Sequence, residues 1–315
     1  MRFHVIMFKT LRDLFSVRRS VLYLIAIAIP VVFGSYMFVN NPFGDFSLSE
    51  MGLLMQNQMV GSFFVIMSFM WIAGLPLAFL SIATCGDFVS KEQQDGTLLV
   101  LVSKPVRRYE IILGKFLAFM VNVALLEAVA FLLSLSLVSS IMNLDTYILN
   151  QLLSILPVLF LYSLLVAFVF SSLATAFSSF SRNRIKTLIA LVGITILIFF
   201  GFTVIRNWTV EYGIYEGYGL NYLDVNYHLG NAYVFLLDSS GMRLMPISQG
   251  VLGMFTGVYD LVDFAKLLDR DIGAFPPSLE KKNYVHPVGS ISLWPALAVV
   301  LLLAGMITLE RREIE

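Results

Sequence analysis

Charged residues are scarce in this chain: only 13% of its 315 residues are Asp, Glu, Lys or Arg, whereas soluble domains carry about 25%. Hydrophobic residues make up 58% of the sequence. A soluble fold of this length has no means of burying so much apolar surface. The composition therefore excludes an ordinary soluble domain and indicates a protein that lies in a lipid bilayer.

Cysteine and histidine are also nearly missing. Cys85 is the only cysteine, which excludes an intramolecular disulfide and a cysteine-based metal cluster. The three histidines, His4, His228 and His286, are far apart and form no metal-binding motif, so we expect no metal site. The G-x-x-x-x-G-K-[ST] phosphate-binding loop is absent too, and no basic tail or stripe suggests nucleic acid. We therefore expect no cofactor in this chain and no ATP hydrolysis by it alone.

Apolar runs, by contrast, are plentiful, and six are long enough to cross a bilayer, which takes about 20 residues per helix. They cover residues 21–39, 59–82, 112–141, 151–178, 186–206 and 289–309. A chain in lipid must satisfy its own backbone hydrogen bonds, so all six are predicted to be helices. The predicted fold is an all-α integral membrane protein with six transmembrane helices.

The distribution of Lys and Arg predicts the orientation, because these residues accumulate in short cytoplasmic loops. Fifteen of them lie in residues 1–20, 83–115, 179–186 and the C-terminal tail, and none in 40–58 or 142–150. Both termini are therefore predicted to be cytoplasmic, and the long 207–288 loop to be external.

Two further pieces are expected outside the spans. Residues 1–20 fit a short amphipathic helix that lies along the inner membrane surface. Residues 207–288 are expected to form a small mixed extracytoplasmic cap, with a helix over about 247–269. The domains predicted from this pattern are 1–206 (helices 1–5 with a cytoplasmic segment at 83–111), 207–288 (the cap) and 289–315 (helix 6 and the cytoplasmic tail).

The polar segment between the second and third spans carries the most specific pattern. It reads Ser90-Lys-Glu92, then Gly96-Thr97-Leu98, then Ser103-Lys-Pro105-Val, then Arg108-Tyr-Glu110-Ile-Ile-Leu-Gly114-Lys115. On physical grounds this is a short exposed helix, a turn, an interfacial apolar piece and the start of a new membrane helix. An ordinary cytoplasmic loop fits these residues equally well.

This run resembles the signature of type-2 ABC transporter permeases, in which an acidic residue, Gly-Thr, a Pro-Val-x-Arg turn and Gly-Lys follow in this order. The ending Leu309-Glu-Arg311-Arg312 resembles the basic end of the family. Two features depart from the pattern: the acidic run is diluted by Gln93 and Gln94, and the loop before the last span is long. That long loop resembles the copper-reductase-maturation permeases.

The resemblance implies a membrane subunit that pairs with itself or with a paralogous permease and binds two separate ABC ATPase subunits, which hold the ATP and Mg. It implies that Glu92, Asp95, Gly96 and Thr97 couple the chain to the ATPase. It places Arg107, Arg108 and Lys115 at the membrane interface as anchors. The expected location is the plasma membrane of a prokaryote.

Two polar residues stand inside the third predicted span, Asn122 and Glu127. A carboxylate within a membrane is costly unless it is paired, and it marks function by default. Glu127 is read equally well as a contact along a translocation path or across a dimer, and as a hydrogen-bonded tie between helices.

The predicted function is the permease subunit of an ATP-driven ABC exporter. The first alternative is mechanotransmission, in which the same ATPase moves an extracytoplasmic protein through the cap without transport. A weaker alternative is an intramembrane enzyme that depends on Glu127.

Overall fold

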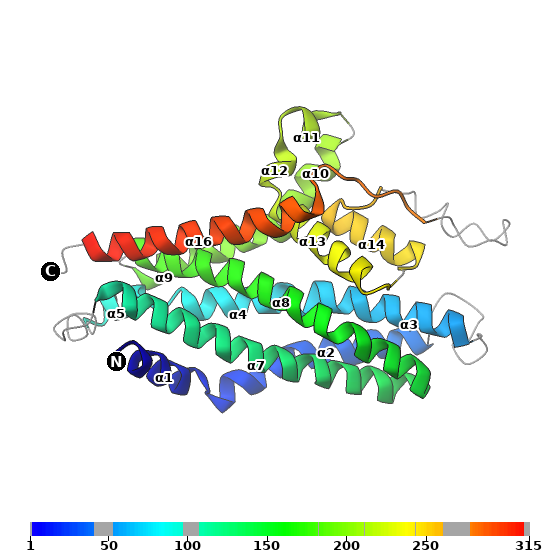
Figure 1. The fold of residues 1–315 in the computed structure, drawn as a ribbon, viewed down its shortest axis with the longest axis horizontal. Helices are drawn as coiled ribbons and strands as arrows, with labels where there is room; N and C mark the ends of the chain where they lie inside the picture. Colours follow the sequence, from blue (N-terminus) through cyan, green and yellow to red (C-terminus); the bar gives the residue numbers. More distant parts are fainter. Residues whose placement is uncertain are drawn as a thin grey trace.

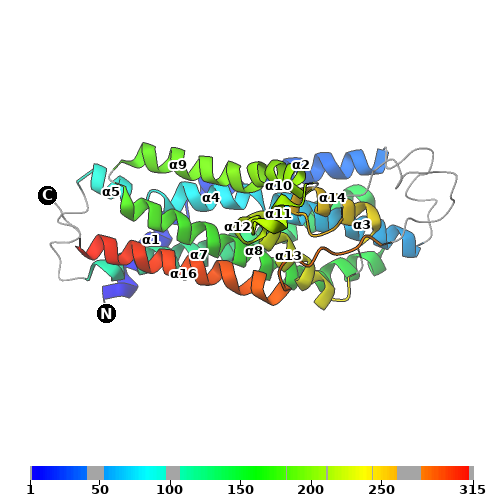
Figure 2. The same ribbon diagram turned by 90° about the horizontal axis from the view of Figure 1, so that it is seen from above.

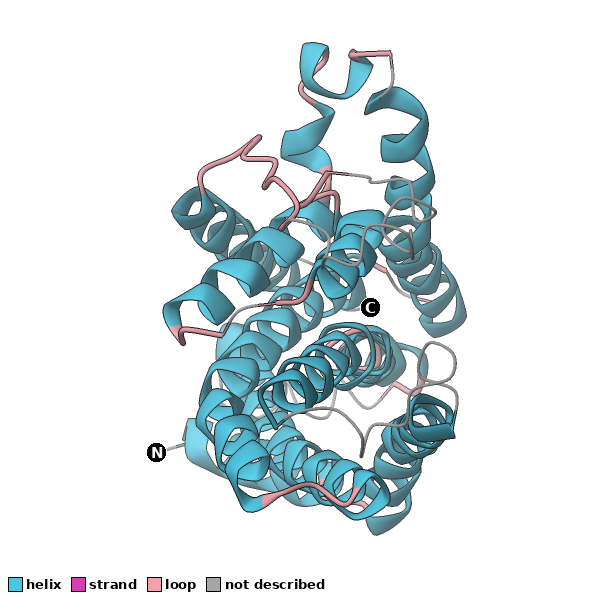
Figure 3. Ribbon diagram, turned by 90° about the vertical axis from the view of Figure 1, so that its right-hand side faces the viewer, coloured by secondary structure: helices cyan, strands magenta, loops and turns pink. Residues whose placement is uncertain are grey.

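The structure is a computed structural model that describes residues 2–40, 53–96, 107–181, 183–210, 212–242, 244–260 and 278–311. In these ranges the chain forms an elongated bundle of helices (Figures 1 and 3). The only pairing of extended backbone within them is an isolated antiparallel bridge between Tyr259 and Lys281. The predicted all-α membrane fold is confirmed.

Six helical segments are long and apolar enough to cross a membrane, as the sequence predicts. They are Val17–Asn40, Gln56–Gln94, Arg108–Met142, Thr146–Phe180, Arg184–Val210 and Pro287–Arg311. Four of the six are uninterrupted helices: α2 (Val17–Asn40), α7 (Arg108–Met142), α8 (Thr146–Phe180) and α16 (Pro287–Arg311). Helix α1 and the C-terminal end of α16 lie at the same end of the bundle, which we call the termini end (Figure 1).

The second and fifth spans are each divided by a π-helical turn. The second consists of α3 (Leu53–Met67), η2 (Ser68–Ile72), α4 (Leu75–Cys85) and the short α5 (Ser90–Gln94). The fifth consists of α9 (Arg184–Ile196), η3 (Leu197–Gly201) and α10 (Phe202–Val210). Pro76 stands in the first turn of α4, where the missing N–H group costs nothing.

Helices α7 and α8 form the longest hairpin of the bundle. Each has 35 residues, which corresponds to about 52 Å of helix against a hydrocarbon core of about 30 Å. Asn143 ends α7 in the left-handed conformation, and the Asp145 carboxylate caps α8 by accepting from the Tyr147 N–H at 2.8 Å. Since the pair is longer than the hydrocarbon layer, part of it extends beyond that layer.

Between the fifth span and α16, the described residues form four helices. They are α11 (Ile214–Gly217), α12 (Leu220–Leu223), α13 (Val225–Ser239) and α14 (Pro246–Thr256). Helices α13 and α14 pack against the bundle, whereas α10–α12 project from its side (Figure 1). The Tyr233 hydroxyl in α13 donates to the Val65 carbonyl in α3 at 2.7 Å, which ties α13 to the second span.

The predicted helix over 247–269 is wrong at its C-terminal end within the described residues. Helix α14 ends at Thr256, because Gly257 adopts φ 72°. A Cβ atom at Gly257 would lie 2.4 Å from Cδ of Arg206, so a side chain does not fit there. Residues 261–277 lie outside the described part.

A buried ion pair joins α10 to α13, and we call it, with its partners, the buried node. Arg206 Nη1 lies 2.5 Å from Asp224 Oδ2, and the two side chains are 2% and 0% exposed. Tyr215 donates its hydroxyl to the same carboxylate oxygen at 2.9 Å, and Arg206 Nη2 donates to the Phe255 carbonyl at 2.5 Å. Asp224 also caps α13 by accepting from the Tyr227 N–H.

Helix α1 (Arg2–Leu14) is amphipathic as predicted, but it does not rest on lipid alone. It packs along the first part of α7, where Ile6 lies against Gly114, and a Cβ at Gly114 would be 3.2 Å from it. Val5 and Phe8 stay exposed on the other side. The apolar face expected to lie on the membrane surface, which includes Ile6, Met7, Leu11 and Leu14, thus packs against the bundle instead.

Candidate coupling segment and the cavity beside it

The segment between the second and third spans lies at the termini end, next to α1 (Figure 1). Helix α4 stops at Cys85, and α5 begins at Ser90 after a turn. Asp95 caps the C-terminus of α5, and Gly96 follows with φ 69°, a conformation that favours glycine. Among the described residues, a Cβ at Gly96 would meet no atom within 4 Å, and Asp95 and Gly96 are both exposed. Thr97 lies outside the described residues.

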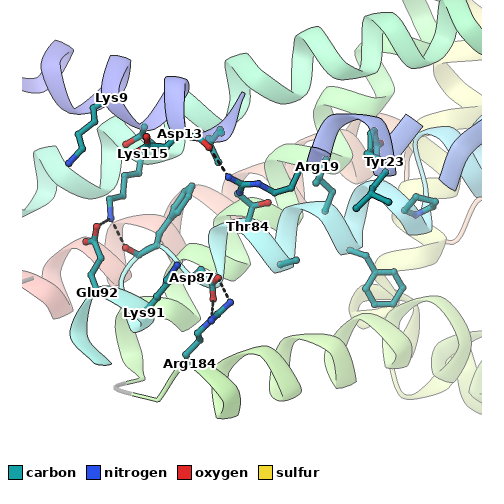
Figure 4. Close-up of a pocket in the computed structure, with 18 of the residues that line it drawn as sticks. Lys9, Asp13, Arg19, Tyr23, Thr84, Asp87, Lys91, Glu92, Lys115 and Arg184 are labelled. Carbon is teal, nitrogen blue, oxygen red and sulfur yellow. Dashed lines mark hydrogen bonds and ion pairs between the residues drawn. The ribbon is translucent and has the colours of Figure 1, made fainter. Parts of the chain in front are cut away.

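Lys115 of α7 holds α5 from one side. Its ammonium lies 2.6 Å from Glu92 Oε1 and donates to the Phe88 carbonyl at 2.7 Å (Figure 4). The Lys115 side chain is only 9% exposed, and that of Glu92 is 24% exposed. Lys115, expected as an anchor at the membrane interface, is therefore buried against the segment, and Glu92 points towards the protein.

Ser178 of α8 holds the start of α5. Its buried hydroxyl oxygen accepts from the backbone N–H groups of Val89 at 2.9 Å and Ser90 at 3.0 Å. The first N–H groups of a helix have no partner within the helix itself. Ser178 therefore satisfies two donors that burial would otherwise make costly.

Arg184, at the start of α9, provides the third contact. Its guanidinium donates from Nε to Asp87 Oδ1 at 2.7 Å and from Nη2 to Oδ2 at 2.8 Å (Figure 4). This two-point pairing fixes direction as well as distance. The arginine is 42% exposed and the carboxylate 22%, so water screens the pair.

The segment 87–92 is thus connected to three different spans, α7, α8 and α9. Sequence reasoning missed three of the residues involved: Asp87, Ser178 and Arg184. The available signal was that opposite charges stand at two span ends on the same predicted side of the membrane. Nothing in the sequence says which of those charges pair, and nothing distinguishes Ser178 from the neighbouring serines.

The two expected anchors at the start of α7 occupy different settings. Arg108 donates from Nη1 to the Leu309 carbonyl at 3.0 Å and so joins α7 to the end of α16. Arg107 is exposed and donates to the Tyr109 hydroxyl at 3.3 Å. The hydrogen bond and charge of Tyr109, with Glu110 nearby, raise the pKa of Arg107 above its usual value.

Asn122 and Glu127 are both buried within the bundle. Glu127 Oε1 accepts a hydrogen bond from the Tyr23 hydroxyl, which joins α7 to α2. Within the described part of the chain, Glu127 Oε2 and Asn122 Oδ1 have no hydrogen-bond partner. Glu127 therefore makes the contact expected of a tie between helices, and it keeps one acceptor unused.

A cavity of 1090 Å³ lies beside the segment, lined by residues of α1, α2, α4, α5, α7 and α9. One part is charged: Lys9, Asp13, Arg19, Asp87, Lys91 and Glu92 border it (Figure 4). The other part is apolar and reaches Tyr23 and Trp71. Figure 2 shows α4 running beside α9 in this half of the bundle. The described residues contain no group of three His, Cys, Asp or Glu placed to hold a metal.

These features define a multi-pass membrane protein whose second and third spans are joined by a short helix fixed to the rest of the bundle. A sequence model of the ABC-2 family transporter proteins matches residues 9–212, more than half of the chain. The chain therefore belongs to the ABC-2 transporter family, which confirms the resemblance drawn from the 90–115 motif. A search of curated proteins found none that matches the chain.

Proposed function

We propose that this ABC-2 family membrane protein is the permease subunit of an exporter driven by separate ABC ATPase subunits. In this proposal α5 is the coupling helix, and the ATPase touches it through Asp95, Gly96 and Thr97. Two ATPase subunits hold ATP and Mg and bind a pair of permease chains, either two copies of this one or this one and a paralogue. Both termini face the cytoplasm of a prokaryotic cell, on the same side as the ATPase.

The observation that carries the proposal is the set of contacts around α5. An exposed helix of five residues transmits force only if it is fixed to the spans, because a loose loop yields instead. Lys115, Ser178 and Arg184 connect it to α7, α8 and α9. A displacement of α5 therefore reaches three spans directly, while Asp95 and Gly96 stay exposed.

The roles of the coupling residues differ within this proposal. Glu92 turns towards Lys115, so it acts in transmission inside the permease. Asp95 and Gly96, at the open end of α5, are the residues that meet the ATPase. Arg108 links this end of α7 to α16, and Arg107 projects towards the headgroup region as an anchor.

The test is co-purification of the chain with an ABC ATPase from the same cell. We expect the charge reversal D95K to release the ATPase, because Asp95 lies at the proposed contact. The matched control is D238K, which reverses an exposed carboxylate in α13 and should leave the complex intact. An ATPase that stays bound to D95K, or that leaves D238K equally, would refute the proposed docking site.

A second function, mechanotransmission, is favoured by two observations. Helices α13 and α14 pack on the bundle, and α7 and α8 are longer than the bilayer core is thick. Motion of the spans is thereby passed to the far end of the molecule. A reconstituted complex that hydrolyses ATP, moves no substrate and requires an extracytoplasmic protein would support this function over export. Turnover that needs no ATP and is lost in E127Q would instead support an intramembrane enzyme.

A further inference from the structure

The cavity beside α5 changes character along its length. Its charged part lies between α1 and α5, and its apolar part continues between α2 and α4. The apolar lining includes Leu22, Trp71, Phe79 and Leu80. An amphiphile fits both parts, with its polar head in the charged part and its acyl chain in the apolar part. A small polar solute fits only the charged part.

The charges around the cavity do not cancel. The pairs Lys115–Glu92 and Arg184–Asp87 neutralise each other. The remaining lining charges are the cations Lys9, Arg19 and Lys91 and the carboxylates Asp13 and Asp95. Three cations thus stand against two carboxylates, which leaves one positive charge in excess.

The excess lies on side chains that are available to a ligand. In the part of the chain that the structure describes, the ammonium groups of Lys9 and Lys91 pair with no carboxylate. Arg19 donates to the Asp13 carbonyl at 2.7 Å, which satisfies a hydrogen bond but does not neutralise its charge. These three cations come from three different helices, α1, α2 and α5, and border one cavity (Figure 4).

We propose that this cavity binds one membrane glycerophospholipid with a singly charged anionic headgroup. The phosphate lies among Lys9, Arg19 and Lys91, and an acyl chain runs along Leu22 and Trp71 towards Tyr23. The volume of 1090 Å³ lies slightly above the range of about 300–1,000 Å³ that is usual for ligand sites, which suits a large ligand such as a lipid. The bound lipid bridges α1 and α5 by charge, because its phosphate contacts both. This site does not depend on whether the chain is an exporter.

Trp71 reports on the site, because it borders the apolar part of the cavity and donates from Nε1 to the Ala26 carbonyl at 2.9 Å. In W208F/W294F, Trp71 is the only remaining tryptophan. The purified chain in detergent is titrated with phosphatidylglycerol or phosphatidylcholine, each carrying brominated acyl chains that quench fluorescence. We expect Trp71 to be quenched by the anionic lipid at roughly fivefold lower concentration, since the one positive charge in excess contributes about a factor of five.

K9Q/K91Q should remove this preference. K186Q should keep the preference for the anionic lipid. Lys186 is exposed in the first turn of α9, near Arg184, but it does not line the cavity. Quenching of Trp208 alone, in W71F/W294F, should not distinguish the two lipids, since Trp208 is 77% exposed on α10.

Native mass spectrometry repeats the comparison without changes to tryptophan. It should show one retained phosphatidylglycerol per chain in K186Q and none in K9Q/K91Q. Equal quenching of Trp71 by both lipids would overturn the proposal. So would an anionic preference that survives K9Q/K91Q, or one that is lost equally in K186Q.

Discussion

Two polar clusters hold different parts of this molecule, and they are built differently. The buried node, Arg206 with Asp224, Tyr215 and the Phe255 carbonyl, is closed to water. The contacts around α5 are partly open: the Arg184 side chain is 42% exposed, and the Glu92 side chain 24%. Breaking the first leaves a charge without water or partner, whereas charges in the second exchange partners with solvent. We therefore expect the buried node to stay fixed and the contacts around α5 to allow motion.

Removal of the charge on Asp224 should have the largest effect. D224N leaves Arg206 charged and buried without its partner, which costs about 3–5 kcal/mol. Thermal unfolding in detergent should therefore show a large loss of stability. D238N, which alters an exposed ion pair with Lys281, should change stability by less than about 1 kcal/mol. Similar effects of D224N and D238N would remove the distinction between the node and the surface pairs.

Compared with D224N, K115M should destabilise the folded chain less but affect coupling more. It removes the ammonium that binds Glu92 and the Phe88 carbonyl, at a cost of about 1–3 kcal/mol, because these hydrogen bonds involve charged groups. ATP hydrolysis in the reconstituted complex should continue while transport falls. K186M removes an exposed cation on α9 and serves as the control. Unchanged transport in K115M would contradict the role of Lys115 in transmission.

S178A tests the contact from α8. The N–H groups of Val89 and Ser90 lose their acceptor, which should cost about 1 kcal/mol and increase hydrogen exchange at these two amides. S154A, on the same helix, removes an exposed hydroxyl that donates to the Gln151 carbonyl within its own helix. If both variants exchange at the same rate around α5, Ser178 does not hold the segment.

Acid should weaken the region around α13 slightly. Burial lowers the pKa of His228 below its usual 6.5, so the unfolded chain binds more protons than the folded one at acidic pH. The stabilisation that neutral His228 gives the folded chain is therefore fully present above about pH 6.5 and decreases as the pH falls through the lowered pKa. Melting curves between pH 7.5 and 5 should show a smaller pH dependence in H228Q than in H286Q, where the exposed His286 is replaced. An equal pH dependence in the two variants would exclude His228 as the cause.

The sequence predicted what depends on local pattern. All six spans follow from apolar runs of sufficient length, and all but the second begin and end close to the predicted limits. The second, predicted to end at residue 82, continues through α5 to Gln94. The turn at Gly96 also follows from residue type, since glycine tolerates φ 69°. The helix over 247–269 was predicted too long, because the close approach of Arg206 to Gly257 is a tertiary contact.

The contacts of the candidate site could not be predicted in the same way. Ser178 and Ser90 are 88 residues apart, and several serines in α8 share its buried face. The 90–115 motif pointed to the segment that we propose as the ATPase contact. It did not show that Glu92 turns inwards to Lys115, because the direction of a side chain at a turn depends on which spans surround it.

The central claim is that motion of α5 passes to the far part of the bundle through its contacts with the spans. Spin labels at Q94C and D238C measure it, because Gln94 is exposed on α5 outside the proposed ATPase contact and the native Cys85 is buried. In the reconstituted complex, ATP should shift the distance between the two labels, and K115M should abolish that shift. An equal shift with and without Lys115, or no shift in the otherwise unaltered chain, would contradict the claim.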